Sequence, residues 1–212
     1  MSPQALTAPY FGAGSPVDHL DIIQYPHPTL RHRAKPLRRV DDVLRRMIGE
    51  MFGLMYNARG IGLAATQVDL PYRMFVVNAT GDPHETSEEM VFINPVLSQP
   101  KGTAEGEEGC LSLPGLYADV KRPERIVLNA YTLSGEEVNM ELDGLMARVV
   151  QHETDHLNGV LFIDRLSTTA SMAVKDVLTD FEQIYAGKLE RGEIPNDAAV
   201  AKRLAELERE RT

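Results

Sequence analysis

The chain has 212 residues, of which 43% are hydrophobic and 25% charged, so it can form one globular core with extensions or two small domains. Its net charge of −9 and pI of about 5.2 argue against nucleic-acid binding, which usually needs a basic face. The sequence contains no run of about 18 apolar residues, the length needed to cross a membrane. Its single cysteine, Cys110, excludes an intramolecular disulfide. We therefore expect a cytoplasmic protein that binds neither membranes nor specific nucleic-acid sequences.

The residue pattern predicts a single main domain with an extension at each end. Residues 1–18 are rich in Ser, Pro, Ala and Gly and lack the basic and apolar regions of a signal peptide. They are expected to form a flexible tail. Residues 19–187 are expected to form the domain that carries the chemistry. Residues 188–212 are expected to form a C-terminal extension with a weakly held, charged helix over 197–211.

Periodic apolar residues predict a helix over 41–57, with Asp41 as its N-cap. A later helix is predicted over 168–186, with one apolar stripe that includes Met172 and Ile184. Alternating and β-branched residues predict four strands, of which the last two form a hairpin: 72–79, 91–97, 125–133 and 136–142. Strands in the first part of the chain and helices after residue 143 indicate an α+β protein.

A helix predicted over 145–157 carries the most informative motif, His-Glu-Thr-Asp-His at 152–156. Positions four apart share one face of a helix, so His152 and His156 can reach one metal ion together. Glu153 lies beside them as a possible proton carrier. Two exposed histidines beside solvated acids would give the same pattern. A third ligand and an oxyanion donor elsewhere would favour the metal site.

The ends of this helix and its inner face also follow from the sequence. Asp143 is placed to cap its start, and Asn158 with Gly159 can end it in a left-handed turn. Leu145 and Val149 lie on the side of the two histidines, so we expect this side to point into the protein. Buried histidines beside a buried carboxylate need polar partners, and a metal ion is one such partner.

The candidate for a third ligand is Cys110, which follows two glutamates and a glycine. A thiolate with two imidazoles suits zinc or ferrous iron, and three protein ligands leave a fourth position for water. Attack on a carbonyl also needs donors for the charge that develops on oxygen. The candidates are the side-chain amide of Gln67 and the backbone N–H of Leu111. Alone, Gln67 could equally be a solvent-facing loop amide.

Three segments together resemble the signature motifs of peptide deformylases, in the same order and with similar spacing. They are Gly-Ile-Gly-Leu-Ala-Ala-Thr-Gln at 60–67, Glu-Gly-Cys-Leu-Ser at 108–112 and Gln-His-Glu-Thr-Asp-His-Leu at 151–157. The segment 25–31 resembles the opening of the same family, and the resemblance covers about residues 20–166. It implies antiparallel β-sheets packed around a central helix that carries the His-Glu-x-x-His motif, with a helix at the C-terminal end.

The resemblance also implies an activity, the removal of the N-formyl group from the formylmethionine of newly synthesised polypeptides, with release of formate. It implies that Glu153 is the general acid and base, and that Gln67 and the Leu111 amide polarise the formyl oxygen. The residues implied to hold the metal are Cys110, His152 and His156. Those implied to contact the substrate are Gly62 through its backbone and Ile61, Leu145 and Val149 around the methionine side chain.

The resemblance makes Fe²⁺ the expected metal, with Zn²⁺, Ni²⁺ or Co²⁺ as alternatives. The expected partners are N-formylmethionyl nascent peptides and the ribosome near its exit tunnel. Tyr117 stands where some relatives carry an arginine that contacts the peptide, so recognition beyond methionine is expected to differ. Arg122 matches a family arginine near the site, and we expect it to neutralise Glu108 or Asp155.

Two other classes of protein remain open from the sequence. A metalloprotease of one class would carry a third histidine where this chain has Phe162, and another class would use an acid such as Glu182 or Asp176. A structural metal module would need a fourth protein ligand. The remaining histidines could supply that ligand only from polar or proline-bearing stretches: His19, His27, His32 and His84.

Overall fold

The computed structural model describes residues 19–212, and the tail expected at 1–18 lies outside the described residues. The four helices of this part are α1 (Asp42–Asn57), α2 (Gly144–Leu157), α3 (Thr168–Glu190) and α4 (Asp197–Arg211). The strands are β1 (Gly62–Ala64), β2 (Met74–Val77), β3 (Met90–Lys101), β4 (Ala104–Cys110), β5 (Leu113–Arg122), β6 (Arg125–Tyr131) and β7 (Glu137–Asp143). Short 3-10 helices occur at Pro28–Arg31, Ala65–Val68, Thr86–Glu88 and Phe162–Arg165.

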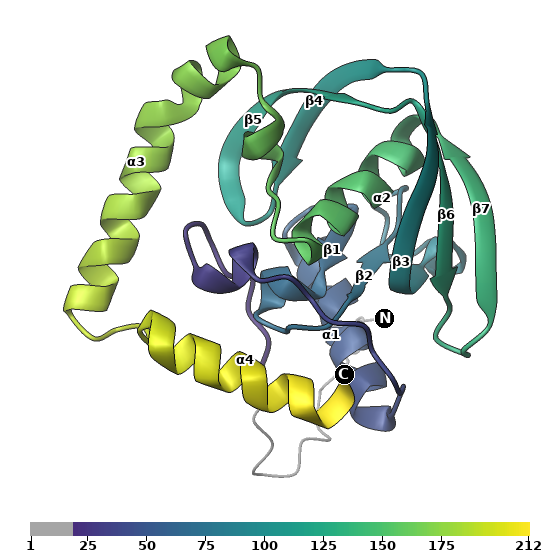
Figure 1. Ribbon diagram of the computed structural model, residues 1–212, viewed down its shortest axis with the longest axis horizontal. Coiled ribbons are helices and arrows are strands. Elements are labelled where there is room, and N and C mark those ends of the chain that lie inside the picture. The colour runs from purple at the N-terminus through teal and green to yellow at the C-terminus, as the bar shows by residue number, and fades with distance from the viewer. Residues whose placement is uncertain (1–18) are drawn as a thin grey trace, which may run out of the picture.

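The strands form two antiparallel sheets, and α2 lies between them (Figure 1). The larger sheet has the order β1-β2-β3-β6-β7, and β4 pairs with β5 in a separate two-stranded sheet. Ala147, Val150 and Leu157 of α2 pack against Phe75 and Leu128 of the larger sheet in one buried cluster. The expected α+β fold, with a helix between antiparallel sheets, is confirmed.

Helix α1 begins where the sequence predicts, because the Asp41 side chain accepts a hydrogen bond from the Leu44 backbone N–H at 2.8 Å. Five of its six buried residues, all but Phe52, recur at three- and four-residue steps: Leu44, Met47, Ile48, Met51 and Met55. They pack with Leu63 of β1 and Met74 of β2 in a second core cluster. The apolar stripe therefore fixes α1 against the start of the larger sheet.

The predicted strands occur, although their ends differ from the prediction. The strand expected at 72–79 is only Met74–Val77, the one expected at 91–97 extends over Met90–Lys101, and the hairpin of β6 and β7 is confirmed. The β4–β5 hairpin was not predicted. Ala104–Cys110 contains two glycines and three glutamates, which are poor strand formers. Its antiparallel pairing with β5, and not the strand propensity of its residues, stabilises the extended conformation.

The start of α2 corrects one expectation. Asp143 occupies the N-cap position, but its side chain makes no capping hydrogen bond. The end of α2 agrees with the prediction, since Gly159 follows Asn158 with φ of +72°. A Cβ atom at Gly159 would lie 2.5 Å from the Arg31 carbonyl oxygen, so this turn requires glycine on steric grounds as well.

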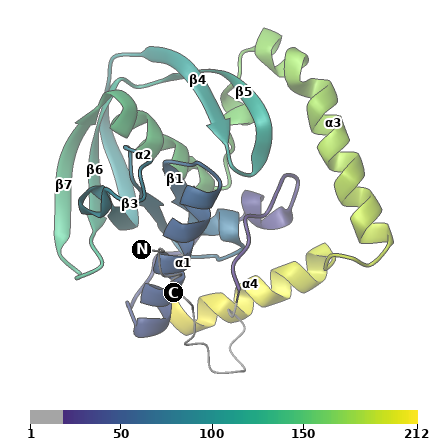
Figure 2. The ribbon, with the colours of Figure 1, turned by 180° about the vertical axis from the view of Figure 1, so that it is seen from behind.

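Helix α3 stands along one side of the molecule (Figures 1 and 2). The helix predicted over 168–186 occurs, but its apolar stripe is only partly buried: Val174 is buried and Phe181 is half-buried, whereas Met172 and Ile184 are 72% and 59% exposed. The helix contacts the core on one narrow face, where its Glu182 carboxylate accepts a hydrogen bond from the Tyr25 hydroxyl at 2.6 Å. In the described part of the chain, no helix combines the length and the apolar character needed to cross a membrane.

Helix α4 is docked on the core, which corrects the expectation of a weakly held helix. It bears the buried residues Val200, Leu204 and Leu207, and Leu207 packs in the same cluster as α1. Charged contacts reinforce this packing. The Glu208 carboxylate accepts from Lys35 Nζ at 2.7 Å, and the Arg211 guanidinium lies 5.7 Å from the Tyr72 ring centroid.

We predict that the Leu207→Ala variant loses about 2–4 kcal/mol of unfolding free energy, because it empties a buried site between α4 and the core. The matched control is Lys202→Ala, which removes an exposed side chain of the same helix and should change stability by less than about 0.5 kcal/mol. Urea unfolding of both variants measures the difference. Equal stabilities would show that α4 does not contribute to the cooperative core.

Candidate metal centre and active site

Three donor atoms converge where β4 ends beside the C-terminal half of α2. Cys110 Sγ lies 3.3 Å from His156 Nε2, which lies 3.2 Å from His152 Nε2. All three ligand atoms lie within 4.8 Å of one another. Tetrahedral bonds of about 2.0–2.3 Å would place such atoms roughly 3.3–3.6 Å apart. The structure thus brings together the three residues that the sequence nominates as metal ligands.

The electrostatics of this cluster favour a bound cation. Burial alone lowers the pKa of His152, but the Cys110 and Glu108 partners outweigh burial and raise it to about 10. The groups that hold this proton would equally attract a metal cation. Burial, followed by the charges of His152 and Arg122, lowers the pKa of His156 well below its ordinary value. His156 is therefore neutral, as a metal ligand must be.

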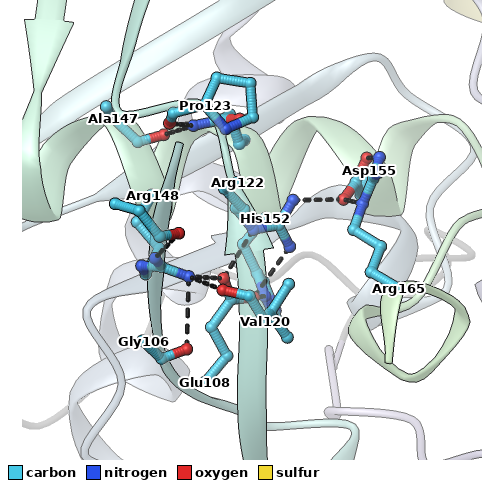
Figure 3. Close-up of polar contacts among 12 residues, drawn as sticks. Gly106, Glu108, Val120, Arg122, Pro123, Ala147, Arg148, His152, Asp155 and Arg165 are labelled. Carbon is cyan, nitrogen blue, oxygen red and sulfur yellow. Dashed lines mark hydrogen bonds and ion pairs between the residues drawn. The ribbon is translucent and has the colours of Figure 1, made fainter. Parts of the chain in front are cut away.

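Glu108 orients the first histidine (Figure 3). Its Oε2 accepts a hydrogen bond from His152 Nδ1 at 3.0 Å, which leaves Nε2 of the ring to face the sulfur. Burial alone would raise the pKa of Glu108, but hydrogen bonds from Arg122 and His152 hold it well below its ordinary value. Glu108 is therefore an anion in the interior, which stabilises positive charge at the cluster.

Arg122 connects two carboxylates, as Figure 3 shows. Its Nε and Nη2 donate to Glu108 at 2.6 and 2.8 Å, and its Nη1 donates to Asp155 at 2.7 Å. The sequence predicted that Arg122 would neutralise one of these two acids, and the structure shows it paired with both. Since all three side chains are buried, each charge depends on the others for compensation.

Two further arginines of this network were missed by the sequence reasoning. Arg148 donates to Glu108 at 2.7 Å and to backbone carbonyls of both strands of the β4–β5 hairpin, so it fastens the hairpin to α2. Its position four residues before His152, on the same helix face, was the available signal. Arg165 forms a bidentate ion pair with Asp155. Nothing in the local sequence around Arg165 indicated this pairing.

The cluster lies at one side of a pocket of about 720 Å³. Ten residues were expected to bind the metal, contact the substrate or take part in catalysis. Nine of them line this pocket: Ile61, Gly62, Gln67, Cys110, Leu111, Leu145, Val149, His152 and Glu153. The tenth, His156, does not line the pocket but contacts Cys110 and His152, which do. Residues from three separate segments of the chain therefore meet at one cavity, as expected for a binding site.

Gln67 is buried beside the sulfur and is not a solvent-facing loop amide. Its Oε1 accepts from the Ala64 backbone N–H at 2.9 Å, which fixes the orientation of the amide. Its Nε2 is thereby directed to Cys110 Sγ at 3.4 Å and to Ser112 Oγ at 3.2 Å. The 3-10 helix Ala65–Val68 thus presents an amide donor at the floor of the pocket.

Glu153 lies against the pocket wall formed by Gly62. A Cβ atom at Gly62 would be only 2.5 Å from Glu153 Oε1, so glycine is needed here for the carboxyl group to fit. The other oxygen, Oε2, is buried and has no hydrogen-bond partner among the described residues. Burial raises the pKa of Glu153 to about 7. The carboxyl group can therefore both accept and release a proton near neutral pH.

The apolar part of the pocket agrees only partly with the expectation. Ile61, Leu111 and Val149 line it, and Val149 is buried. Leu145, however, is 54% exposed, so the expectation of an inward-facing residue is wrong for it. It lies in the first turn of α2, where the helix leaves the core, and borders the cavity from the solvent side.

The alternatives left open by the sequence gain no support from the geometry. Glu182 bonds Tyr25, and the Phe162 ring stacks near the His152 ring with centroids 6.2 Å apart. Over residues 19–212, the only group of at least three His, Cys, Asp or Glu side chains close enough to share an ion is Cys110, His152 and His156. A fourth protein ligand, which a structural site needs, is therefore absent from the described residues.

We predict that the Arg122→Ala variant loses about 3–5 kcal/mol of unfolding free energy, because it breaks two buried ion pairs and leaves Arg148 as the remaining arginine partner of Glu108 and Arg165 as that of Asp155. Metal affinity should fall about 10–100-fold, since Glu108, which orients His152, then loses the two hydrogen bonds that Arg122 donates to it. The neighbouring Lys121→Ala variant changes an exposed side chain and serves as the control. Urea unfolding and metal content of the purified proteins measure both effects, and wild-type values in both would contradict this role of Arg122.

Comparison with known proteins identifies the family. The family model described as Polypeptide deformylase matches residues 19–172. A peptide deformylase of Rhodopirellula baltica is 49% identical over 189 residues, which are 89% of this chain and 94% of the relative. A peptide deformylase of Neisseria meningitidis is 48% identical over 159 residues, which are 75% of this chain and 93% of the relative.

Solved structures agree with the sequence relatives. A peptide deformylase of Plasmodium falciparum superposes with a TM-score of 0.77 at 36% identity, covering 79% of this chain and 98% of its own. One from Legionella pneumophila gives 0.71 at 39% identity, covering 79% and 97%. This chain therefore belongs to the peptide deformylase family, whose members are metal-dependent hydrolases that remove N-formyl groups from nascent peptides.

Proposed function

We propose that Cys110, His152 and His156 hold one divalent metal ion and that Glu153 moves the proton during hydrolysis of the formyl group of formylmethionyl peptides. The observation that carries this proposal is the convergence of the three ligand atoms within 4.8 Å, beside a buried carboxyl group with a pKa of about 7. When bound, the ion supplies Lewis-acid activation of water and of the formyl carbonyl.

Glu153 is the general base and then the general acid. Its buried Oε2, free of protein hydrogen bonds in the described residues, accepts the proton that the attacking water loses. The same carboxyl group returns that proton to the methionine nitrogen as the carbon–nitrogen bond breaks. The products are formate and a peptide with a free amino group. A pKa of about 7 suits both transfers at neutral pH.

Gln67 and Leu111 stabilise the negative charge that develops on the formyl oxygen. The Gln67 amide is held by Ala64, so its Nε2 is oriented before the substrate arrives. Its two hydrogens face Cys110 and Ser112, and the one directed at Ser112 can be redirected to the substrate oxygen. The backbone N–H of Leu111, directly after Cys110, is the second donor.

The substrate side chain occupies the apolar part of the pocket. Ile61, Leu145 and Val149 surround the methionine side chain, while the backbone of Gly62 contacts the substrate beside Glu153. Leu145, being largely exposed, covers the methionine from the solvent side. Burial of the thioether chain against these residues orients the formyl group toward Gln67 and the three ligands.

We propose Fe²⁺ as the metal in the cell, as the resemblance to peptide deformylases implies. A thiolate with two imidazoles also suits Zn²⁺, Ni²⁺ and Co²⁺, so the ligand set alone does not choose among these ions. The nascent-chain substrate supports a cytoplasmic site of action, with an encounter at the ribosome near the exit tunnel. The overall negative charge supports binding to a protein surface or to the peptide itself rather than to exposed nucleic acid.

We predict that the Glu153→Gln variant binds metal as the wild type does but releases formate from formyl-Met-Ala-Ser about 10²–10⁴-fold more slowly, because an amide cannot carry the proton. Glu105→Gln, a change on the exposed side of β4, is the control and should retain wild-type turnover. More than about a tenth of wild-type activity in Glu153→Gln would contradict the assignment. Cleavage of an internally placed bond in an acetylated peptide would instead indicate a protease.

A further inference from the structure

The mouth of the pocket carries charges that the reaction does not use. Four charged residues other than Glu153 and His152 line the cavity: Arg59, Glu107, Glu108 and Arg148. Arg148 is occupied by Glu108 and by backbone carbonyls of the hairpin, and Glu108 also pairs with Arg122. Arg59 and Glu107 are exposed, and neither forms an ion pair with any described residue. A substrate chain that leaves the pocket therefore passes one uncompensated cation and one uncompensated anion.

Arg59 is held at the mouth by the end of α1. Its backbone adopts φ of +58°, a left-handed conformation that favours glycine and costs an arginine about 1–2 kcal/mol. The turn is fixed by the Arg59 N–H, which donates to the Tyr56 carbonyl at 2.9 Å, and by the Gly60 N–H, which donates to Met55 at 2.8 Å. Arg59 thus has a fixed backbone directly before the pocket wall that begins at Gly60.

The residues of 107–117 that line the pocket include no cation. Gly109 of β4 pairs with Tyr117 of β5, and a Cβ atom at Gly109 would lie 2.5 Å from Tyr117 Cε1, so the ring lies against the bare glycine. Tyr117 is 62% exposed and borders the pocket with an uncharged aromatic face. Within residues 19–212, Arg59 is therefore the pocket-lining cation that remains available to a substrate.

We propose that Arg59 selects formylmethionyl chains that carry an acidic side chain at the first or second residue after methionine. This inference rests on the proposed function, in which the formyl group lies at Gln67 and the methionine side chain lies beside Val149. The residues that follow methionine must then leave through the mouth, past Arg59. A guanidinium binds a carboxylate through two parallel hydrogen bonds, so an acidic side chain gains an interaction that its amide analogue lacks.

The test uses four substrates with amidated C-termini, so that the terminal carboxylate adds no charge. They are formyl-Met-Glu-Ala-amide, formyl-Met-Ala-Glu-amide and the two analogues with Gln in place of Glu. The rate of formate release gives kcat/KM, and the ratio of each Glu peptide to its Gln analogue measures the preference. One solvent-accessible ion pair is worth about 0.2–1 kcal/mol, so we expect a ratio of about 1.5 to 5, expressed mainly in KM.

The variants assign the preference to Arg59. We expect a ratio near one in Arg59→Gln and a ratio below one in Arg59→Glu, which makes the mouth wholly acidic. Arg46→Gln removes the same charge from an exposed position on α1 that does not line the pocket, and should keep the wild-type ratio. Raising the salt concentration to about 1 M shortens the Debye length to about 3 Å and should reduce the ratio in the wild type.

The outcomes separate this inference from the proposed function. A wild-type ratio near one at both positions, or the same preference in Arg59→Gln, overturns the role of Arg59. An equal loss of preference in Arg46→Gln overturns it too, because the effect is then one of net charge. Formate release from the two Gln peptides tests the reaction itself, so a failure with all four peptides contradicts the proposed function.

Discussion

The buried carboxylate of Glu108 is the charge on which the geometry of the site depends. A carboxylate in the interior is costly unless every oxygen is paired, and Glu108 is paired with Arg122, Arg148 and His152. Because these partners come from β5 and α2, the pairing holds the end of β4 against the helix. It thereby fixes the position of Cys110, two residues further along the chain, relative to the histidines.

Burial has a different consequence for Glu153, the residue that follows His152 in α2 and lines the same pocket. Glu153 forms no ion pair with an arginine among the described residues, and burial outweighs the charges of His152 and Arg122 and raises its pKa to about 7, whereas the paired Glu108 stays ionised. Two glutamates of one site thus differ in their protonation because their surroundings differ. Gly62 allows this by leaving room for the Glu153 carboxyl group against the wall of the pocket.

The sequence predicted the parts of the site that depend on residue spacing within one helix or on recognisable motifs. His152 and His156 follow from helical periodicity, and the resemblance to peptide deformylases placed Cys110 and Gln67 beside them. The β4–β5 hairpin was not predictable from its glycines and glutamates, because cross-strand pairing and Arg148 stabilise it. The docking of α4 was missed for a related reason: Glu208 meets Lys35, which lies far away in the chain.

The account is tested most directly by X-ray absorption at the metal edge of the enzyme purified without oxygen. We predict one sulfur scatterer at about 2.3 Å and two imidazole nitrogens at about 2.0–2.1 Å, with the sulfur lost in Cys110→Ser. A first shell without sulfur in the wild-type enzyme, or a sulfur that persists in Cys110→Ser, would contradict the claim that β4 and α2 share one metal ion.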